Sequence, residues 1–458
     1  VLQEAFRTTE TCRFADLLLP AASWGEKEGT VTNSERRISH VRQAIPAPGQ
    51  ARADWAITVD FAQRLEQRLR PGTPSLFAFD QPQALFDEYK QLTRERDLDL
   101  SGISYAVLDQ QGPQQWPFPA GARTGTPRLY GDGIFPTESG RANFIAEPYR
   151  AAKELRDARF PLTLNTGRLR DQWHGMSRTG TAARLFGHVS EAVLSLHPDE
   201  MRRHRLQAGD LVSLKSRRGS LIVPVSSDDS VRPGQAFLPM HWGDRFLKGG
   251  VNVLTQPAFD PLSKQPELKH TGVRIEAVTL PWQLFALVES DVQAHLEALR
   301  PLCENFAYAS LSLAGRERPA LLIRAASTQA PDNQLLTQID QLLGLNEGPV
   351  LSYDDPRRSI GKRVRIENGR ITAIRLAGET IAQHWLQNLW LEGRADEQLR
   401  RWLLAPISTP PGNAAATPHS SKTLCNCMNV SESAVLAGIG RGLDLIELKT
   451  QLGCGSQC

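Results

Sequence analysis

The amino-acid sequence predicts an α/β and β protein made of consecutive parts that differ in secondary structure. Short apolar runs alternate with amphipathic helices near the start, which is typical of an α/β fold. Short strands separated by turn residues follow, and this pattern favours an all-β barrel. Four of the six cysteines lie between Cys425 and Cys458, which indicates a separate small domain. The predicted parts are an α/β domain at 1–159, a β-barrel at 160–281, a small α+β domain at 282–404, a linker at 405–422 and a small helical domain at 423–458.

The composition is that of an ordinary globular protein. Of 458 residues, 40% are hydrophobic, which suffices for a sizeable core. The 53 basic residues are interleaved with 50 acidic ones and the formal net charge is only +3, so no nucleic-acid partner is expected. No run of about eighteen apolar residues occurs, so no membrane span is expected. The chain opens on Val1 without a targeting segment and closes on Cys458 within a cysteine motif, so we expect it to be the C-terminal portion of a longer protein.

The first seventy residues are expected to form an α/β segment. Candidate strands run over Val1–Ala5 and Asp16–Pro20, with a short helix at Thr9–Phe14 between them. The polar segment Ser23–Arg37 follows the second strand, and ligands bind at the carboxyl ends of strands in open α/β sheets. A ligand-binding loop and an exposed, mobile loop are both consistent with this position.

Two amphipathic helices are predicted next. Asp54 suits an N-cap, and the helix Trp55–Leu69 has one apolar face that should meet a core. That face consists of Val59, Ala62, Leu65 and Leu69. A second helix should run from about 80 to 93, with Pro82 in its first turn. Residues 112–139 are rich in Pro and Gly and predict an irregular crossing.

Short strands and turns alternate over residues 160–281. Val212 and Leu214 flank Ser213, which is the period of a half-buried strand. Residues 216–219 form a turn between two such strands and predict a hairpin. The expected strands are 161–166, 193–196, 211–216, 220–226, 235–239 and 272–278.

The segment Thr166–Thr179 carries the densest cluster of residues suited to ligand binding. It begins where a short strand ends at a Thr-Gly turn. Gly167 lets backbone N–H groups approach an anion, and Arg168 offers a planar fork for a phosphate. Trp173 and His174 offer flat faces and ring nitrogens for a heterocycle. Taken alone, these residues fit a polar loop over a β-domain equally well.

Two later segments have the same character. The expected strand 235–239 leads into His241 and Trp242, and a third loop runs from Asn252 to the cation of Lys269. The three segments together favour a ligand-binding site over a polar surface loop.

These segments follow the order T-G-R, W-H, P-x-H-W, N-x-L-T and P-E-L-K. In this order the chain resembles the C-terminal, cofactor-binding domain of the molybdopterin oxidoreductases, and most closely the assimilatory nitrate reductases. The earlier pattern A-D-x-x-L-P-A-A followed by E-K-E-G-T-x-T-N-x-E-R-R is similar to a signature of the same family. The resemblance implies a double-psi β-barrel at 160–281 and bis-molybdopterin guanine dinucleotide carrying molybdenum as the cofactor.

The resemblance also implies which residues hold the cofactor. The amide of Gly167, Arg168 and Lys269 are expected at the phosphates. Gln3 and Glu4 are expected to reach the guanine of one dinucleotide. The complete set of expected cofactor-binding residues is Thr166, Gly167, Arg168, Trp173, His174, Gly175, His241, Trp242, Asn252, Lys269, Asn33, Glu35 and Arg36.

For the heterocycle, the resemblance implies two kinds of contact. Trp173 and Trp242 are expected to pack on its faces, although core filling is the simpler explanation of each Trp. His174 and Asn252 are expected to donate to its polar edge. Met240 aligns with a position that faces the substrate funnel above the metal in relatives, and no catalytic residue is expected between Val1 and Cys458.

Residues 282–404 are expected to form a small α+β domain for docking or spacing. Asn368-Gly369 suits a primed turn and predicts a hairpin over 362–376. Residues 353–404 resemble the small domain that precedes the iron–sulfur unit in NADH-dependent nitrite reductases. The other expected elements are helices at 290–299, 333–343, 380–391 and 395–404 and strands at 306–313 and 319–325.

The end of the chain predicts a tethered metal site. Residues 405–422 are rich in Pro, Ser, Thr, Gly and Ala, as flexible linkers are. Cys425 and Cys427 lie one residue apart with further cysteines about thirty positions on, which suits tetrahedral binding of iron or zinc. The segment resembles a bacterioferritin-associated ferredoxin type of [2Fe-2S] domain, which implies Cys458 as third ligand and a fourth ligand beyond Cys458. The alternative pairs Cys454 with Cys458.

The resemblance implies a cytoplasmic enzyme that reduces nitrate to nitrite by oxygen-atom transfer at molybdenum. Electrons would enter through the [2Fe-2S] centre from a reductase, ferredoxin or flavodoxin. A [4Fe-4S] cluster and the protein ligand to molybdenum are expected upstream, so this portion alone should not turn over. The alternatives are a formate dehydrogenase on the same scaffold, an electron-transfer module in which only residues 423–458 function, and a scaffold that binds an anion without a cofactor.

Overall fold

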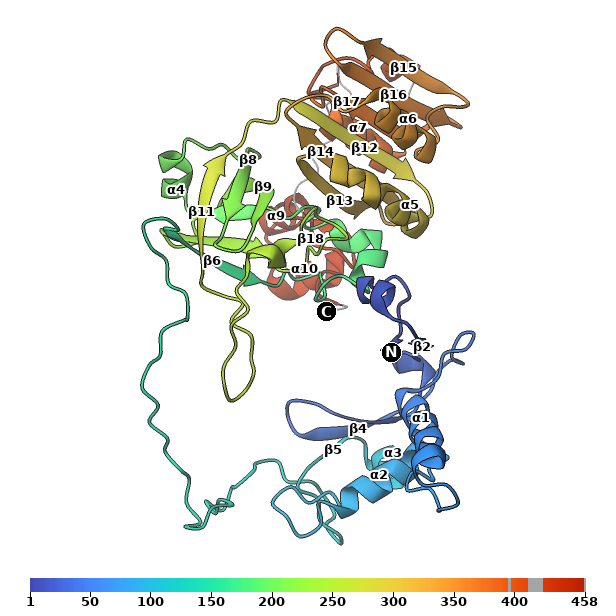
Figure 1. Cartoon of the computed structure of the whole chain (residues 1–458), viewed down its shortest axis with the longest axis vertical. Coiled ribbons are helices and arrows are strands. Elements are labelled where there is room, and N and C mark those ends of the chain that lie inside the picture. Colours follow the sequence, from blue (N-terminus) through green and yellow to red (C-terminus); the bar gives the residue numbers. More distant parts are fainter. Residues whose placement is uncertain (394–396, 411–422, 457–458) are drawn as a thin grey trace. The chain divides into compact units, whose positions relative to one another are not determined.

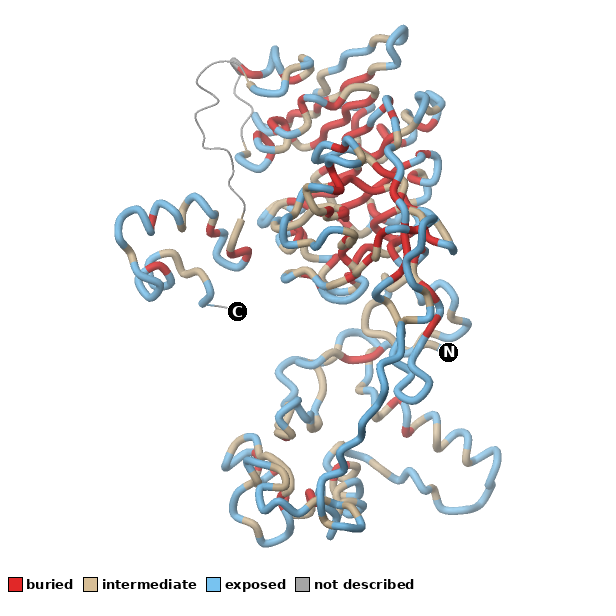
Figure 2. Tube along the Cα trace, turned by 90° about the vertical axis from the view of Figure 1, so that its left-hand side faces the viewer, coloured by how far each residue is buried: buried red, intermediate tan, exposed pale blue. Residues whose placement is uncertain are grey.

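A computed structural model describes residues 1–393, 397–410 and 423–456. The chain divides into two compact units, Val1–Tyr149 and Arg150–Cys458 (Figure 1). Buried residues are sparse in the first unit and dense in the second (Figure 2). Most of the predicted linker and the predicted ligand Cys458 lie outside the described residues. Within the described ranges, no helix has the length and apolar character needed to cross a membrane.

The first unit opens with the predicted strand pair. Strand β1 (Leu2–Glu4) pairs in parallel with β2 (Leu18–Pro20), and a 3₁₀ helix, η1 (Glu10–Phe14), connects them. A second 3₁₀ turn, η2 (Trp24–Glu26), follows and is closed by a capping box between Ser23 and Glu26. The predicted strands and the short helix are therefore confirmed.

The polar segment after β2 is not a loop throughout, which corrects the prediction for residues 23–37. It contains β3 (Gly29–Thr32), which forms an antiparallel hairpin with β4 (Arg37–Val41), and β5 (Gln114–Gln115) pairs with β4. The side chain of Asn33 closes the hairpin turn by accepting the N–H groups of Glu35 and Arg37 at 2.9 and 3.0 Å. The β-branched residues of β3 favour a strand despite the polarity around them.

Three helices complete the first unit: α1 (Asp54–Leu69), α2 (Pro82–Gln91) and α3 (Tyr105–Gln111). Both predicted helices are thus confirmed, although the N-cap of α1 is Ala53. The predicted core face of α1 is only partly buried, since Leu65 is 44% and Leu69 is 71% exposed. The core of this unit is small and lies elsewhere; it consists of Ile38, Phe86, Leu100, Ile103, Tyr105, Leu108 and Phe118.

The second unit begins with a closed six-stranded barrel. All six predicted strands are present: β6 (Leu162–Gly167), β7 (Leu194–Leu196), β8 (Leu211–Lys215), β9 (Ser220–Ser227), β10 (Gln235–Pro239) and β11 (Thr271–Ala277). They pair in the order β10-β6-β11-β8-β9-β7, and β7 closes on β10. Two pairs, β6 with β10 and β7 with β9, are parallel. The connections carry α4 (Pro198–Arg203), η3 (Thr179–Thr181), η4 (Ala183–Phe186) and η5 (Val251–Leu254).

A six-stranded antiparallel sheet follows the barrel, in the order β13-β14-β12-β17-β16-β15. The predicted hairpin is present, and Asn368 and Gly369 at its turn have φ of 51° and 72°, as a primed turn requires. The central strand β12 and the edge strand β15 were missed by the sequence prediction. The strands are β12 (Trp282–Glu289), β13 (Tyr308–Ala314), β14 (Ala320–Ser327), β15 (Val350–Asp355), β16 (Ile360–Glu367) and β17 (Arg370–Ala377).

Helices cover both faces of this sheet. One face packs against α5 (Val292–Leu299) and α6 (Asn333–Leu342), the other against α7 (Gln383–Glu392) and α8 (Glu397–Arg400). The 3₁₀ helix η6 (Arg300–Asn305) follows α5. The helix predicted at 395–404 is shorter than expected, and its first two residues lie outside the described ranges.

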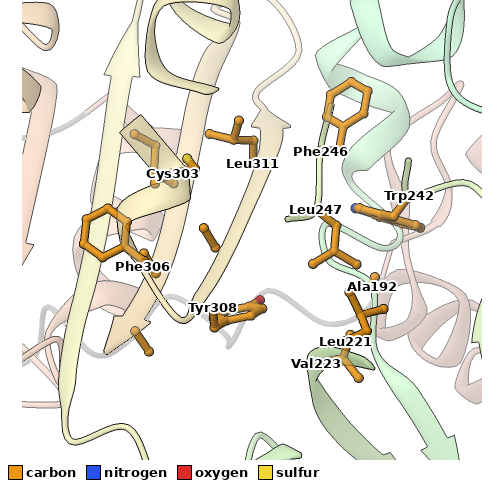
Figure 3. Packing of buried hydrophobic residues seen from close by; sticks show 14 of the residues in the cluster. Ala192, Leu221, Val223, Trp242, Phe246, Leu247, Cys303, Phe306, Tyr308 and Leu311 are labelled. Atoms are coloured by element: carbon orange, nitrogen blue, oxygen red, sulfur yellow. The ribbon is translucent and has the colours of Figure 1, made fainter. Parts of the chain in front are cut away.

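The barrel and this sheet share one hydrophobic core. Figure 3 shows Trp242, Phe246 and Leu247 of the barrel part in the same cluster as Phe306 and Leu311 of the sheet part. Residues 353–404 were expected to form part of a separate small domain. They supply β16 and β17 to the six-stranded sheet, and this sheet packs against the barrel in the shared core. Continuous burial of apolar surface holds the barrel and the sheet together.

The described part of the C-terminal segment is small and contains two helices together with a hairpin that the sequence analysis did not predict. Strands β18 (Thr423–Cys425) and β19 (Val430–Ser431) form a hairpin, followed by α9 (Glu432–Gly440) and α10 (Leu445–Leu452). Ser431 caps α9, and Asp444 caps α10 in a capping box with Glu447.

Candidate cofactor site at the barrel rim

Two parallel strands of the barrel end side by side and supply the core of the site. In the register of β6 and β10, Thr166 lies opposite Leu238 and Gly167 opposite Pro239. The N–H of Met240 donates to the carbonyl oxygen of Gly167 at 2.9 Å, so the pairing continues past the strand ends. Since the strands are parallel, the loops that follow them leave from the same edge of the barrel.

Gly167 is required by its neighbour across the strand pair. A Cβ at this position would lie 2.7 Å from the ring of Phe237, closer than side chains approach one another. Gly therefore allows the two backbones to run side by side where they leave the barrel. This is the residue for which the sequence predicts a close approach of backbone N–H groups to an anion.

His241 ties the two exits together. Its Nε2 accepts the N–H of Leu169 at 2.8 Å, and its Nδ1 lies 2.7 Å from the carbonyl oxygen of His174. These partners require a neutral ring that carries its proton on Nδ1. The side chain is fully buried, and burial together with the nearby Arg168 lowers its pKa below 6.5. Both ring nitrogens are used by the backbone, so His241 acts on the site by holding residues 169–174 in place.

The third predicted loop reaches the same strand end. The ammonium of Lys269 donates to the carbonyl oxygen of Thr166, and the hydroxyl of Thr166 donates to the carbonyl oxygen of Leu268 at 3.1 Å. The cation of Lys269 thus lies beside Gly167 although the two residues are far apart in the sequence. Three segments that are distant in the chain meet at the end of β6, as expected for a phosphate site.

The exposed part of the loop presents a cation and two rings. The guanidinium of Arg168 lies 5.6 Å from the ring centre of Trp173, and the rings of Trp173 and His174 meet edge to face at 4.6 Å. Trp173 is 50% exposed, and His174 and Gly175 are exposed as well. A Cβ at Gly175 would meet nothing within 4 Å. This cluster can pack on a flat heterocycle and neutralise an anion.

Other expected residues are placed differently. Trp242 is fully buried in the shared core, so its ring serves as core filling and is not available to a ligand. Asn252 is exposed on η5, which is joined to Trp242 by a hydrogen bond of 2.9 Å from the N–H of Val251. Met240 is half-buried directly after β10. The structure thus brings the expected residues at the end of β6 together and sets Trp242 apart from them.

The expected residues of the first unit make local contacts there. Asn33 closes the β3–β4 turn, and the exposed Glu35 follows it. Arg36 has φ of 65° and donates to the carbonyl oxygen of Pro127 at 3.0 Å. Gln3 donates to Asp54 at 2.6 Å, and Glu4 accepts the N–H groups of the two residues that follow it.

The cysteine pair occupies a tight turn. Cys425 is buried, and backbone N–H groups of Gly455, Met428 and Cys427 lower the pKa of its thiol. Cys427 is exposed. Amide donors around sulfur favour the thiolate, which is the form that binds metals.

The runner-up ligand Cys454 makes a contact of its own. Its thiol lies 3.8 Å from the carbonyl oxygen of Leu448 within α10. In the described ranges, no three His, Cys, Asp or Glu side chains come together to hold a metal ion. The remaining predicted ligand, Cys458, lies outside those ranges.

Sequence reasoning missed the residues that contact the cysteine turn. Asp171 accepts a hydrogen bond from the side chain of Asn426, and Arg316 donates to the backbone carbonyl oxygen of Asn426. Arg170 donates to the backbone carbonyl oxygen of Leu424. Arg170 lies within the predicted ligand-binding segment Thr166–Thr179, but the sequence analysis assigned it no role. The partners are 110 to 255 positions apart in the sequence, so no local pattern reveals them.

Comparison with known proteins identifies two domains. Residues 162–272 match the family described as molydopterin dinucleotide binding domain. Residues 1–64 match the family described as molybdopterin oxidoreductase. The first match coincides with the barrel, and the second with the opening strands and α1.

The similar curated proteins include both nitrate reductases and formate dehydrogenases. A nitrate reductase of Klebsiella oxytoca is 31% identical over 486 residues, covering 100% of this chain and 50% of that protein. A nitrate reductase of Synechocystis sp. is 42% identical over 291 residues, covering 60% and 38%. The F420-dependent formate dehydrogenase subunit alpha of Methanocaldococcus jannaschii is 34% identical over 278 residues, covering 61% and 39%.

The chain spans half or less of the length of these three relatives, at 50%, 38% and 39%. The comparison therefore supports the two matched domains of this chain. It does not extend the activity of a whole relative to it. The chain thus matches the molybdopterin oxidoreductase family over residues 1–64, carries a molydopterin dinucleotide binding domain at 162–272, and is similar to nitrate reductases.

Proposed function

We propose that the barrel rim, meaning the loops that follow β6 and β10 together with Lys269, binds one dinucleotide of a bis-molybdopterin guanine dinucleotide. The whole protein is proposed to reduce nitrate to nitrite. The observation that carries the proposal is the meeting of three distant segments at the end of β6, where Lys269 and Arg168 flank Gly167. Two cations and a glycine backbone form the donor set that a pyrophosphate needs. The residues present thus fit the cofactor.

Each residue at the rim has a distinct proposed role. Gly167 offers its backbone, while Arg168 and Lys269 neutralise the phosphates. Trp173 and His174, exposed at the surface of the loop, pack against the heterocycle. When bound, the molybdenum centre supplies the oxygen-atom transfer, and the protein supplies binding and orientation.

The C-terminal segment is proposed to hold a [2Fe-2S] cluster through Cys425, Cys427 and Cys458. The amide donors around the sulfur of Cys425 support a thiolate in the described part of this site. The nitrate reductase of Klebsiella oxytoca aligns over 100% of this chain, so the segment belongs to the aligned region of that relative. Electrons are proposed to arrive here from a separate reductase, ferredoxin or flavodoxin.

Formate oxidation is the second candidate, because the formate dehydrogenase subunit of Methanocaldococcus jannaschii is 34% identical over 61% of the chain. Nitrate is favoured by the higher identity of 42% to the nitrate reductase of Synechocystis sp. over a similar share. Assaying the whole protein for nitrite formation from nitrate and for formate oxidation separates the two. Formate oxidation without nitrate reduction would refute our choice of substrate.

The cofactor site is tested in the whole protein by removing one cation at a time. Arg168→Gln and Lys269→Met should each lower the pterin and molybdenum retained after purification about tenfold, because a charged hydrogen-bond partner of the phosphates is lost. Arg274→Gln and Lys215→Met are the matched controls, since both are cations on barrel strands that pair with Glu276 away from the loops of the site. Retention at the normal level in both Arg168→Gln and Lys269→Met would exclude the rim as the phosphate site.

A further inference from the structure

The cysteine turn is held by side chains from two other parts of the second unit. The carboxylate of Asp171, on the loop after β6, accepts the side-chain N–H of Asn426 at 2.7 Å. Arg316, in the turn between β13 and β14, donates to the carbonyl oxygens of Asn426 and Cys427, the latter at 3.0 Å. Arg170 donates to the carbonyl oxygen of Leu424. The contacts involve the backbone and Asn426, so the cysteine side chains stay available for a metal.

Asn426 is the centre of this contact. Its side chain is buried, at 5% exposure, although Cys427, Met428 and Asn429 that follow it are exposed. A Cβ at Gly187 would lie 3.2 Å from its side-chain oxygen, so the small residue permits the close approach. A buried polar side chain is stable only where its donors are satisfied, and the charged acceptor Asp171 meets that need.

The receiving loop is the one that carries the proposed cofactor contacts. Arg168 and Trp173 form the cation–ring cluster, while Arg170 and Asp171, which lie between them in the sequence, hold the cysteine turn. Arg170 and Asp171 are themselves paired at 2.9 Å through two hydrogen bonds, which fixes the carboxylate that Asn426 uses. Two residues span about 7 Å at most, so Trp173 lies close to the docked turn.

We propose that residues 169–171 and Arg316 form a docking surface for the C-x-C turn of this same chain, and that the docked turn is the position from which electrons leave the proposed [2Fe-2S] cluster on their way to molybdenum. The docking itself follows from the contacts, while its redox role rests on the proposed function. The loop after β6 would then position both the cysteine turn and the proposed cofactor contacts, so that a change at the cysteine turn alters the position of Arg168 and Trp173.

Hydrogen exchange in the full chain, read by mass spectrometry, tests the docking. Arg316→Gln should speed exchange in residues 423–431 about tenfold, because two hydrogen bonds to the turn are lost. If the docked turn protects residues 168–173, hydrogen exchange over those residues should also increase in this variant, but by a smaller factor. Asp171→Ala should act in the same direction on residues 423–431. Arg274→Gln, an exposed arginine on β11, is the control and should change neither region.

Unchanged exchange of residues 423–431 in both Arg316→Gln and Asp171→Ala would overturn the docking. Arg316 lies in a turn between strands, so a response to its substitution is not a consequence of unfolding the rim loop. Iron and pterin contents of the same samples keep the two proposals apart. Faster exchange of residues 423–431 in the two variants supports docking, and the redox role is refuted if the same protein contains no iron. Unchanged exchange of these residues in iron-loaded protein refutes docking alone.

Discussion

Replacing His241 by Leu tests whether this buried ring organises the rim. Leu is apolar and of similar size, so it removes the hydrogen bonds to Leu169 and His174 while leaving the space filled. The N–H of Leu169 and the carbonyl group of His174 then lose their partners. The loop that carries Arg168 and Trp173 should open more often, without unfolding of the barrel.

The size of the effect follows from these two contacts. An unsatisfied buried donor or acceptor costs about 1–3 kcal/mol. His174 is exposed and Leu169 half-buried, so water can partly replace the lost bonds and the low end of the range applies. A total of about 2 kcal/mol corresponds to roughly a 30-fold larger population of the open loop.

Hydrogen exchange over residues 168–176 measures this opening directly. His241→Leu should raise exchange there roughly 30-fold, and His241→Gln, which keeps a donor and an acceptor, should recover part of the protection. His204→Gln, at the exposed end of α4, is the control. Equal protection of the loop in the Leu variant and the unmodified protein would refute the organising role of His241.

The same ring predicts a pH dependence. Burial keeps the pKa of His241 below its ordinary value of 6.5, whereas the unfolded ring binds a proton near that value. The unfolded chain therefore binds more protons as the pH falls below 6.5, and the stability contributed by the neutral ring decreases. This contribution is complete above 6.5. Loop exchange should accelerate on acidification below 6.5, and His241→Gln should weaken that response.

Three further outcomes are expected in the second unit. Gly167→Ala should destabilise the barrel by about 1–3 kcal/mol in urea unfolding through contact with the ring of Phe237, and Phe237→Leu should relieve it; a lack of rescue would contradict this cause. Asp340→Ala should cost about 3–5 kcal/mol because it strands the buried guanidinium of Arg375, now bonded at 2.9 and 2.6 Å, and Arg375→Met in the same chain should restore most of the loss. Burial raises the pKa of Cys303 to about 12, so iodoacetamide should modify this thiol only after denaturation, and labelling of the native protein would contradict its burial.

Local patterns in the sequence determined much of the secondary structure. The barrel strands were predicted because side chains alternate in polarity and turn residues separate the runs. The Asn368-Gly369 turn was predicted because few residue pairs adopt positive φ at both positions. Strand β12 was missed since it is buried on both faces and shows no alternation. Residues 29–32 were missed because their polar surroundings suggested a loop.

At the site, residue types and motif order pointed to Gly167, Arg168 and Lys269, but only the tertiary structure decided how these residues are used. The sequence does not distinguish the roles of Trp173 and Trp242, yet Trp173 is half exposed and Trp242 lies in the core. His241 holds the loop after β6 because two backbone groups of that loop, the N–H of Leu169 and the carbonyl group of His174, reach its two ring nitrogens. Asn426 meets Asp171 across 255 positions. Composition and spacing record the local preferences of a chain, whereas burial and long-range pairing depend on how all its segments pack together.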